Sequence, residues 1–72
     1  MEKKFLDYIA SVFGVDPSTI SMETSYGSIP QWDSLMQLCI VAGLLDEFNV
    51  DIPINEVANI KTLGDFYKYF EN

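Results

Sequence analysis

The sequence predicts an all-α fold: a small four-helix bundle of three main helices and one short helix, with a long loop between the first and second helices. Apolar residues recur at helical spacing near both ends of the chain, and a long apolar segment lies between them. No strand-like alternation persists. The 72 residues, 49% hydrophobic and 21% charged, suit a single globular domain over residues 1–72.

A first helix is predicted over residues 2–13. Its apolar face consists of Phe5, Leu6, Tyr8, Ile9, Val12 and Phe13. Gly14 follows as the C-terminal stop. Asp16 and Pro17 then predict a capped single turn, because Asp caps helices and Pro favours the first helical position.

Residues 21–33 form a long loop without helical or strand periodicity. Such a loop is unusual in so small a domain, and long loops are often functional. Large apolar side chains would be wasted on a flexible linker. We therefore expect four of them to hold the loop against the core: Met22, Tyr26, Ile29 and Trp32.

A second helix is predicted over residues 34–48, closed by Asn49. Residues 55–59 predict one short helical turn, with Ile54 and Val57 packing inward.

Thr62 is the expected N-cap of the last helix, and Asp65 lies in its first turn. The apolar side of this helix is expected to enter the core through Leu63, Phe66, Tyr67 and Phe70.

Composition excludes several functional classes. Eleven acidic residues against four Lys, with a net charge of −7 and no Arg, argue against binding nucleic acid or an anionic membrane surface. The absence of His excludes Ser-His and Cys-His nucleophile pairs and His-ligated metals. A single Cys excludes an internal disulfide or a thiolate zinc cluster. We therefore expect no catalytic residue and no metal site, and a protein that is not an enzyme.

The chain also lacks the expected signals for membrane insertion or export. Its longest non-polar run, residues 38–45, is far shorter than the roughly 20 residues of a membrane helix. The N-terminus has no long apolar core of a signal peptide. A cytoplasmic monomer with no membrane span is the expectation.

Two roles are open for the residues that begin the second helix. Residues 34–37 fit a capping box, S-x-x-Q, with Ser34 as a cap that contributes roughly 1 kcal/mol. Asp33 fits an N-cap or a first-turn charge equally well.

At residues 32–35, Trp-Asp-Ser-Leu, the sequence resembles the acyl carrier protein family. The resemblance spans essentially the whole chain and includes residues 44–48, Ile52-Pro53 and residues 62–66. It implies that Ser34 is the attachment point for 4′-phosphopantetheine, installed from coenzyme A by a Mg²⁺-dependent phosphopantetheinyl transferase. The arm's thiol would carry acyl or aminoacyl cargo as a thioester, from a loading enzyme to a downstream synthase or transferase.

General chemistry supports that assignment. A phosphodiester at Ser34 would lie at a helix N-terminus, which favours anions. No neighbouring residue in the sequence can activate the Ser34 hydroxyl, so the base must come from the partner enzyme. Asp33 is a candidate ligand for the transferase's Mg²⁺, which prefers oxygen.

The second helix departs from the family pattern, in which acids commonly follow Asp-Ser-Leu and the helix docks partners. Met36, Gln37 and Cys39 stand where acids are common, and only Asp46 and Glu47 come later. This departure argues against generic salt-bridge docking. It predicts a specialised biosynthetic pathway rather than bulk fatty-acid synthesis.

The second helix is apolar on all sides, so one side is expected to remain outside the core. We expect Ile40, Leu44 and Phe48 to face inward, with Gln37 and Val41 beside them. The opposite line is predicted to be an exposed docking stripe, the alternative being a helix buried on both sides. With Trp32, Met36 and Asp46, the candidate docking residues are Leu35, Leu38, Cys39, Ala42 and Leu45.

Trp32 and Cys39 each have a structural interpretation as well. Trp32 is favoured as a loop anchor over a contact with the arm or a partner. Cys39 is favoured as a small packing residue over a reactive thiol.

The cargo and two alternative functions remain open. An aromatic content of 14% predicts a filled core and a short or polar cargo presented outward. The candidates for lining any cavity are Met36, Ala58 and Gly64. The alternatives are an aminoacyl or peptidyl carrier, and an unmodified helical interaction module in which Ser34 is only a cap.

Overall fold

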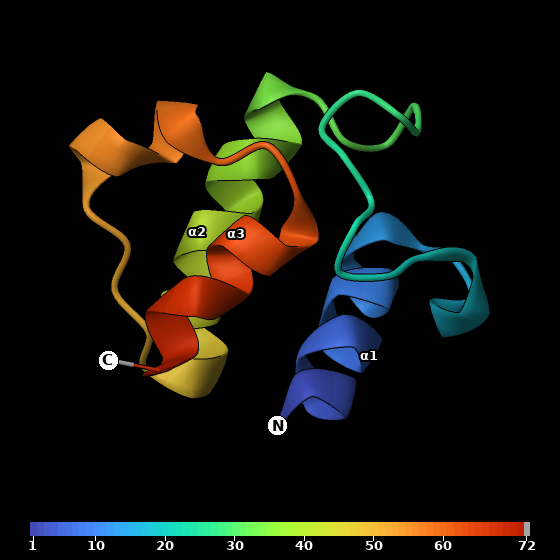
Figure 1. Ribbon diagram of the computed structural model, residues 1–72, viewed down its shortest axis with the longest axis horizontal. Coiled ribbons are helices and arrows are strands. Elements are labelled where there is room, and N and C mark those ends of the chain that lie inside the picture. Colours follow the sequence, from blue (N-terminus) through green and yellow to red (C-terminus); the bar gives the residue numbers. More distant parts are fainter. Residues whose placement is uncertain (72) are drawn as a thin grey trace.

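The computed structural model describes residues 1–71 and confirms the predicted all-α fold (Figure 1). Among these residues no strand forms, and a single isolated bridge pairs Ser25 with Thr62. The α-helices and the short 3-10 helices occur in the order α1 Glu2–Phe13, η1 Pro17–Thr19, α2 Ser34–Phe48, η2 Ile54–Asn59, α3 Leu63–Tyr67 and η3 Lys68–Glu71.

Helix α1 and the turn after it follow the sequence prediction. Gly14 closes α1 in the left-handed conformation, with φ 74°, and its N–H donates to the Ala10 carbonyl at 2.8 Å. Asp16 caps η1 by accepting the Ser18 N–H at 2.9 Å, and Pro17 takes the first helical position.

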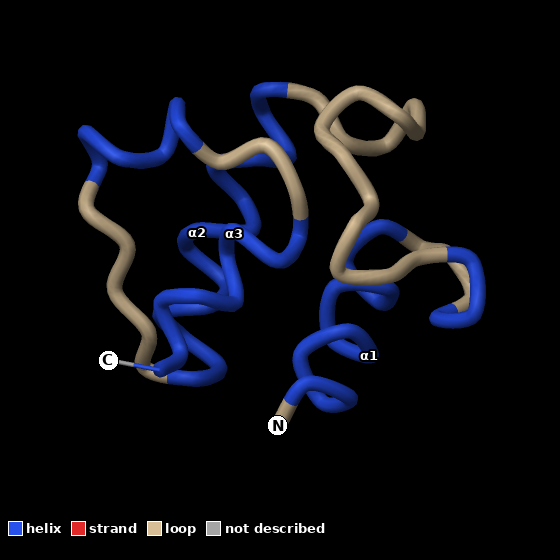
Figure 2. The backbone as a smooth tube through the Cα atoms, in the orientation of Figure 1, coloured by secondary structure: helices blue, strands red, loops and turns tan. Residues whose placement is uncertain are grey.

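Backbone hydrogen bonds hold the long loop between η1 and α2, drawn in tan in Figure 2, to Lys61 and to the first turn of α3. The N–H of Tyr26 donates to Lys61 O at 2.7 Å, and the N–H of Gly64 donates to Met22 O at 2.8 Å. These bonds satisfy backbone groups that a free loop would leave to water. The loop is therefore part of the folded unit.

Trp32 anchors the end of this loop in the core. It is 1% exposed, and its ring centroid lies 5.8 Å from that of Phe13 and 6.2 Å from that of Phe66. The anchor interpretation is confirmed, and the assignment of Trp32 to a docking surface is wrong because a buried indole is inaccessible to a partner. Tyr26 stays exposed although its ring packs against Trp32 at 5.8 Å, so it covers the core rather than entering it.

Helix α2 buries the side that was predicted to face the core, with Gln37, Ile40 and Leu44 inside. Asn49 ends it with φ 57°, and the Asn49 N–H donates to Leu45 O at 3.0 Å. The helix therefore begins and ends where the sequence predicted.

The segment after α2 contains one correction. Val57 of η2 packs inward as predicted, but Ile54 is 75% exposed. Ile52, just before Pro53, fills the core instead. Sequence patterning could not distinguish these two isoleucines, because the irregular chain around Pro53 has no fixed period.

Helix α3 begins with the predicted cap. Thr62 Oγ1 accepts the Asp65 N–H, and the Asp65 carboxylate accepts the Thr62 N–H, each at 3.2 Å. Phe66 is fully buried, whereas Tyr67 and Phe70 stack on each other and cover Phe5, with centroid distances of 5.3 Å to the Phe5 ring.

Candidate functional site

Ser34 is the first residue of α2 and is exposed. Asp33, not Ser34, caps the helix: the Asp33 carboxylate accepts the Met36 N–H at 2.8 Å. The alternative of a capping box at residues 34–37 does not form, because Asp33 rather than Ser34 is the N-cap residue. Within residues 1–71, the Ser34 hydroxyl makes no hydrogen bond, and its side chain is exposed to solvent.

The start of α2 favours an anion on that hydroxyl. The first N–H groups of a helix lack intrahelical carbonyl partners, and the helix dipole places partial positive charge there. The first turn itself contains no acidic side chain, although the Asp33 carboxylate caps it and already accepts the Met36 N–H. A phosphodiester on Ser34 would therefore gain about 0.3–1 kcal/mol from this position.

Ser34 lies on the wall of an apolar groove, which we call the Ser34 groove. Its volume is about 450 Å³, at the lower end of the range for small-molecule sites. Helix α2, η2 and their neighbouring loops contribute the lining residues Tyr26, Ser34, Gln37, Leu38, Ile54, Val57, Ala58, Ile60 and Lys61.

The side chain of Gln37 forms the floor of the Ser34 groove. Its Nε2 donates to Val57 O at 3.1 Å and to Ile60 O at 3.4 Å, and its Oε1 accepts the Trp32 indole N–H at 2.6 Å. Gln37 is 7% exposed, and its amide joins α2 both to the long loop and to η2. Of the predicted lining residues, Ala58 contributes, and Met36 and Gly64 do not.

The predicted stripe along α2 is exposed. Leu35, Leu38 and Leu45 are 70%, 50% and 49% accessible to solvent. This result excludes a helix buried on both sides.

The remaining docking candidates differ in their accessibility. Cys39 and Ala42 are exposed along the stripe, and Asp46 is exposed near its C-terminal end. Cys39 is therefore not the packing residue that we expected. Met36 is half-buried against the core and offers only part of its side chain.

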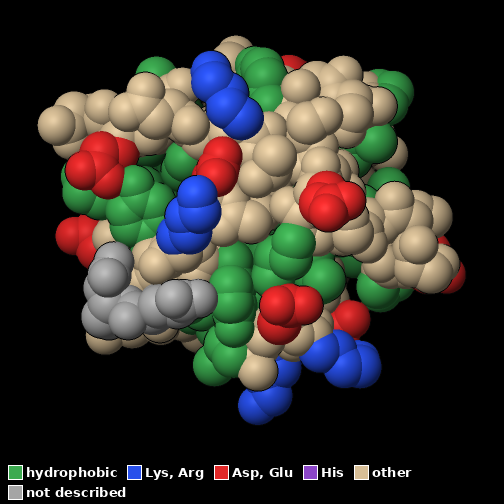
Figure 3. All heavy atoms as spheres, in the orientation of Figure 1, with side chains coloured by type: hydrophobic (Ala, Val, Ile, Leu, Met, Phe, Trp, Pro, Cys, Tyr) green, Lys and Arg blue, Asp and Glu red, His purple; other side chains and the backbone are tan. Residues whose placement is uncertain are grey.

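Charged side chains do not gather into one patch on the face seen in Figure 3. Lys3 pairs with Asp7 at 2.9 Å and Lys68 with Asp65 at 3.2 Å. The pKa of Asp65 is below its ordinary value, chiefly because the backbone N–H of Lys61 donates to its carboxylate at 2.9 Å.

Residues 1–71 contain neither a cluster of metal ligands nor a membrane-spanning helix. Nowhere in this range do three His, Cys, Asp or Glu side chains group as metal ligands would. No helix in the range has the length and apolar character that crossing a membrane requires.

Comparison with known proteins identifies the family. The profile of a family described as a phosphopantetheine attachment site matches residues 3–70. The acyl carrier protein of Porphyromonas gingivalis is 32% identical over 99% of this chain and 91% of its own length. The chain belongs to the acyl carrier protein family. The acyl carrier proteins of Lactobacillus acidophilus and Clostridium acetobutylicum are 35% and 30% identical, over 96% of this chain and 86% and 90% of theirs.

Family membership identifies the cofactor of this acyl carrier protein as covalently attached 4′-phosphopantetheine. The bound group supplies a long flexible arm whose terminal thiol carries acyl groups as thioesters. The site fits such a group, because an exposed, unbonded serine hydroxyl stands at a helix N-terminus and opens onto an apolar groove. The family also implies two kinds of partner, phosphopantetheinyl transferases and biosynthetic enzymes.

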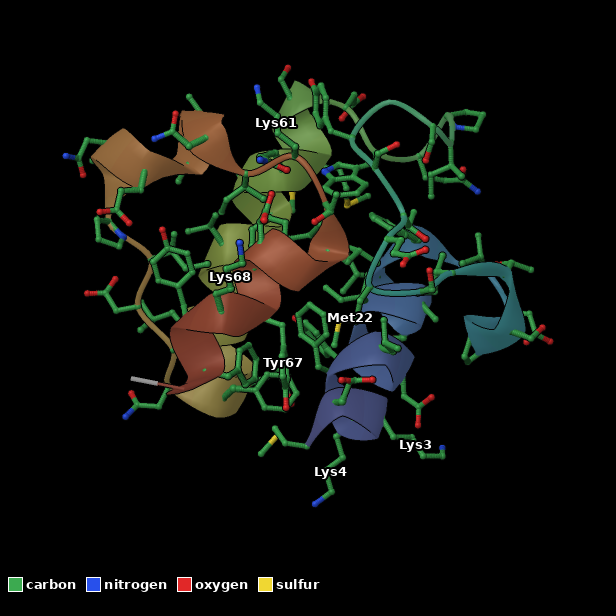
Figure 4. The ribbon with its side chains drawn as sticks, viewed as in Figure 1. Lys3, Lys4, Met22, Lys61, Tyr67 and Lys68 are labelled. Carbon is green, nitrogen blue, oxygen red and sulfur yellow. The ribbon has the colours of Figure 1, made fainter. Side chains whose placement is uncertain are left out.

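Sequence reasoning missed three residues that line the groove of this carrier protein together with Ser34: Tyr26, Ile54 and Lys61. Lys61 lies in the segment between η2 and α3, beside the first turn of α2 (Figure 4). No sequence period or motif links these residues to Ser34. Tyr26 and Lys61 reach the groove together because the Tyr26 N–H donates to the Lys61 carbonyl, and Ile54 reaches it from η2.

Proposed function

We propose that Ser34 is the residue that receives 4′-phosphopantetheine, so that the protein carries acyl intermediates and performs no catalysis itself. The observation that carries this proposal is the exposed, unbonded hydroxyl of Ser34 at the first turn of α2. A site that leads from a helix N-terminus into an apolar groove suits an arm that is anionic near its attachment point and less polar beyond it.

Asp33 has a second role in this proposal. One oxygen of its carboxylate accepts the Met36 N–H, and a carboxylate has two oxygens with lone pairs to spare. The other oxygen is available to Mg²⁺ in the transferase complex. The cap would hold the carboxylate in a constant position beside the Ser34 hydroxyl while the transferase supplies the base.

The stripe of Leu35, Leu38, Cys39, Ala42 and Leu45 supports a partner surface that is chiefly apolar. Exposed apolar residues along one face of a helix mark interaction sites, and acids are confined to the C-terminal part of this helix. Partners with a strongly basic docking patch would find few carboxylates here. This composition supports a specialised pathway with its own partner enzymes rather than bulk fatty-acid synthesis.

The decisive experiment is intact mass after incubation with coenzyme A, Mg²⁺ and a broad-specificity phosphopantetheinyl transferase. We expect the mass to increase by one phosphopantetheine, and Ser34→Ala to remain unmodified. Ser28→Ala is the matched control, because Ser28 is an exposed serine of the adjoining loop. Modification of Ser34→Ala would contradict the proposal. So would the absence of any modification of the folded parent protein by transferases from several classes.

A further inference from the structure

The buried polar cross-link beneath the Ser34 groove is not explained by attachment of an arm. Gln37 is the one buried polar side chain among the described residues, and every buried side-chain polar atom there has a hydrogen-bond partner. An aliphatic residue at this position could fill the floor of the groove and would need no hydrogen-bond partner. The amide instead ties together three segments, at Trp32, Val57 and Ile60.

We infer that Gln37, held by Trp32, is a specificity-determining residue that closes the interior of the bundle to cargo and so restricts the protein to short acyl groups. This inference rests on the proposed function, in which Ser34 carries the acylated arm. It names the class of cargo, which that function leaves open.

The closure follows from the position of the Gln37 amide. Gln37 lies on α2 between Ser34 and Leu38, and its Nε2 donates to the carbonyls at both ends of the Val57–Ile60 segment. A chain passing from the groove into the core between α2 and η2 would have to displace this amide. The Trp32 N–H and the Ile60 carbonyl would then lose the Gln37 amide as their partner, while the Val57 carbonyl would keep the Ile60 N–H. Leaving buried polar groups without partners is unfavourable.

The core that such a chain would enter is built of buried side chains. Trp32, which bonds to the Gln37 amide, is 1% exposed, and Ile40 and Phe66 of the same core are fully buried. Close-packed interiors resist insertion of further methylene groups.

The outer part of the groove can still cover a short apolar group. Leu38 of α2 and Ile54 of η2 both line the groove and are 50% and 75% exposed, so each has apolar surface to bury. A groove of about 450 Å³ has room for part of the arm and a short acyl group. A long chain must extend beyond it into water.

The test loads Ser34 with phosphopantetheine carrying acetyl, butyryl, octanoyl or dodecanoyl groups, using the transferase and the matching acyl-coenzyme A. Intact mass first reports loading. Thermal midpoint and the rate of thioester cleavage by hydroxylamine then report burial of the acyl chain. For the parent protein we expect neither measurement to change from butyryl to dodecanoyl, and retention on a hydrophobic column to increase with chain length.

Gln37→Met replaces the amide with a flexible apolar side chain that can move aside, and Gln37→Ala opens the floor further. In either variant that folds, we expect dodecanoyl to slow hydroxylamine cleavage several-fold and to raise the thermal midpoint relative to butyryl. Gln31→Ala is the matched control, because Gln31 is exposed in the neighbouring loop, and it should behave as the parent.

Three results would overturn the inference. Protection of the dodecanoyl thioester in the parent would show that the interior accepts long chains. Folded Gln37 variants with no dependence on chain length would show that Gln37 does not set the limit. Absence of any mass increase at Ser34 would instead overturn the proposed function, and this inference with it.

Discussion

The hydroxyl of Tyr8 occupies the space in which a β-carbon at Gly43 would stand. Tyr8 lies on α1 and Gly43 in the middle of α2. Because Gly43 has no side chain, the Tyr8 ring can pack directly against the backbone of α2. The ring also packs edge-on against Phe48, with centroids 5.6 Å apart. Glycine in a helix interior costs about 1 kcal/mol relative to alanine, and this contact explains its presence.

Gly43→Ala is therefore expected to destabilise the protein despite its better helix propensity. Overpacking costs about 1–3 kcal/mol, against a gain of about 1 kcal/mol from the helix. In a Tyr8→Phe background the hydroxyl is gone, and the cost should fall by about 1 kcal/mol. Urea unfolding of the four proteins measures the coupling. Strictly additive free energies would contradict the contact.

The cap and the chemistry of Asp33 can be separated by substitution. Asp33→Asn keeps an oxygen for the Met36 N–H, so stability should barely change, whereas Asp33→Ala should lose about 1 kcal/mol. If the carboxylate also contacts Mg²⁺ during transfer, both variants should accept phosphopantetheine more slowly. Thermal unfolding and a mass-based time course measure the two effects. If phosphopantetheine is transferred to Asp33→Asn at the normal rate, Asp33 acts only as the helix cap.

The ionised Asp65 carboxylate is expected to stabilise the fold at neutral pH and to lose this effect in acid. The Lys61 N–H lowers the pKa of this carboxyl in the folded protein, so its contribution is present above the unfolded pKa and is lost as pH falls through the lower folded value. Asp65→Asn should be less stable than the parent at neutral pH, and the difference should shrink below about pH 4. Urea midpoints across that range provide the measurement; a difference that stays constant with pH would argue against the ionised carboxylate.

The apolar stripe predicts docking that depends little on salt. Leu45→Ala should raise the KM of a partner enzyme for the carrier protein about tenfold, equivalent to ~1.4 kcal/mol, if Leu45 is a contact at the centre of the interface. Because Leu45 is already 49% exposed, stability should change by less than about 1 kcal/mol. Asp46→Asn, the adjacent exposed position, is the control and should have a smaller effect. A larger loss for Asp46→Asn, disappearing at high ionic strength, would indicate salt-bridge docking instead.

Local features of this fold were predictable because local physics produces them. The bounds of α1 and α2 follow from the apolar period together with the left-handed residues Gly14 and Asn49. The Thr62 cap follows from its spacing to Asp65. The exposed stripe was predictable as well, because a helix that is apolar on all sides cannot bury all of them in so small a bundle.

The errors fall where neighbours distant in sequence decide the outcome. Trp32 was open to a docking role until the rings of Phe13 and Phe66 were seen to enclose it. Ile54 was expected inside, and Ile52 takes that place. The Ser34 capping box failed by one residue, because both Asp33 and Ser34 are good caps and the sequence cannot choose between them.

The sequence by itself determined the helical class, the helix ends and the motif around Ser34, since all of these depend on residues within a turn or two of one another. Only the tertiary structure decided what surrounds that serine. Gln37 became the floor of a groove because Trp32, Val57 and Ile60 arrive there from separate segments. A buried amide is stable only where all its hydrogen-bonding groups find partners, and those partners exist only once the chain has folded.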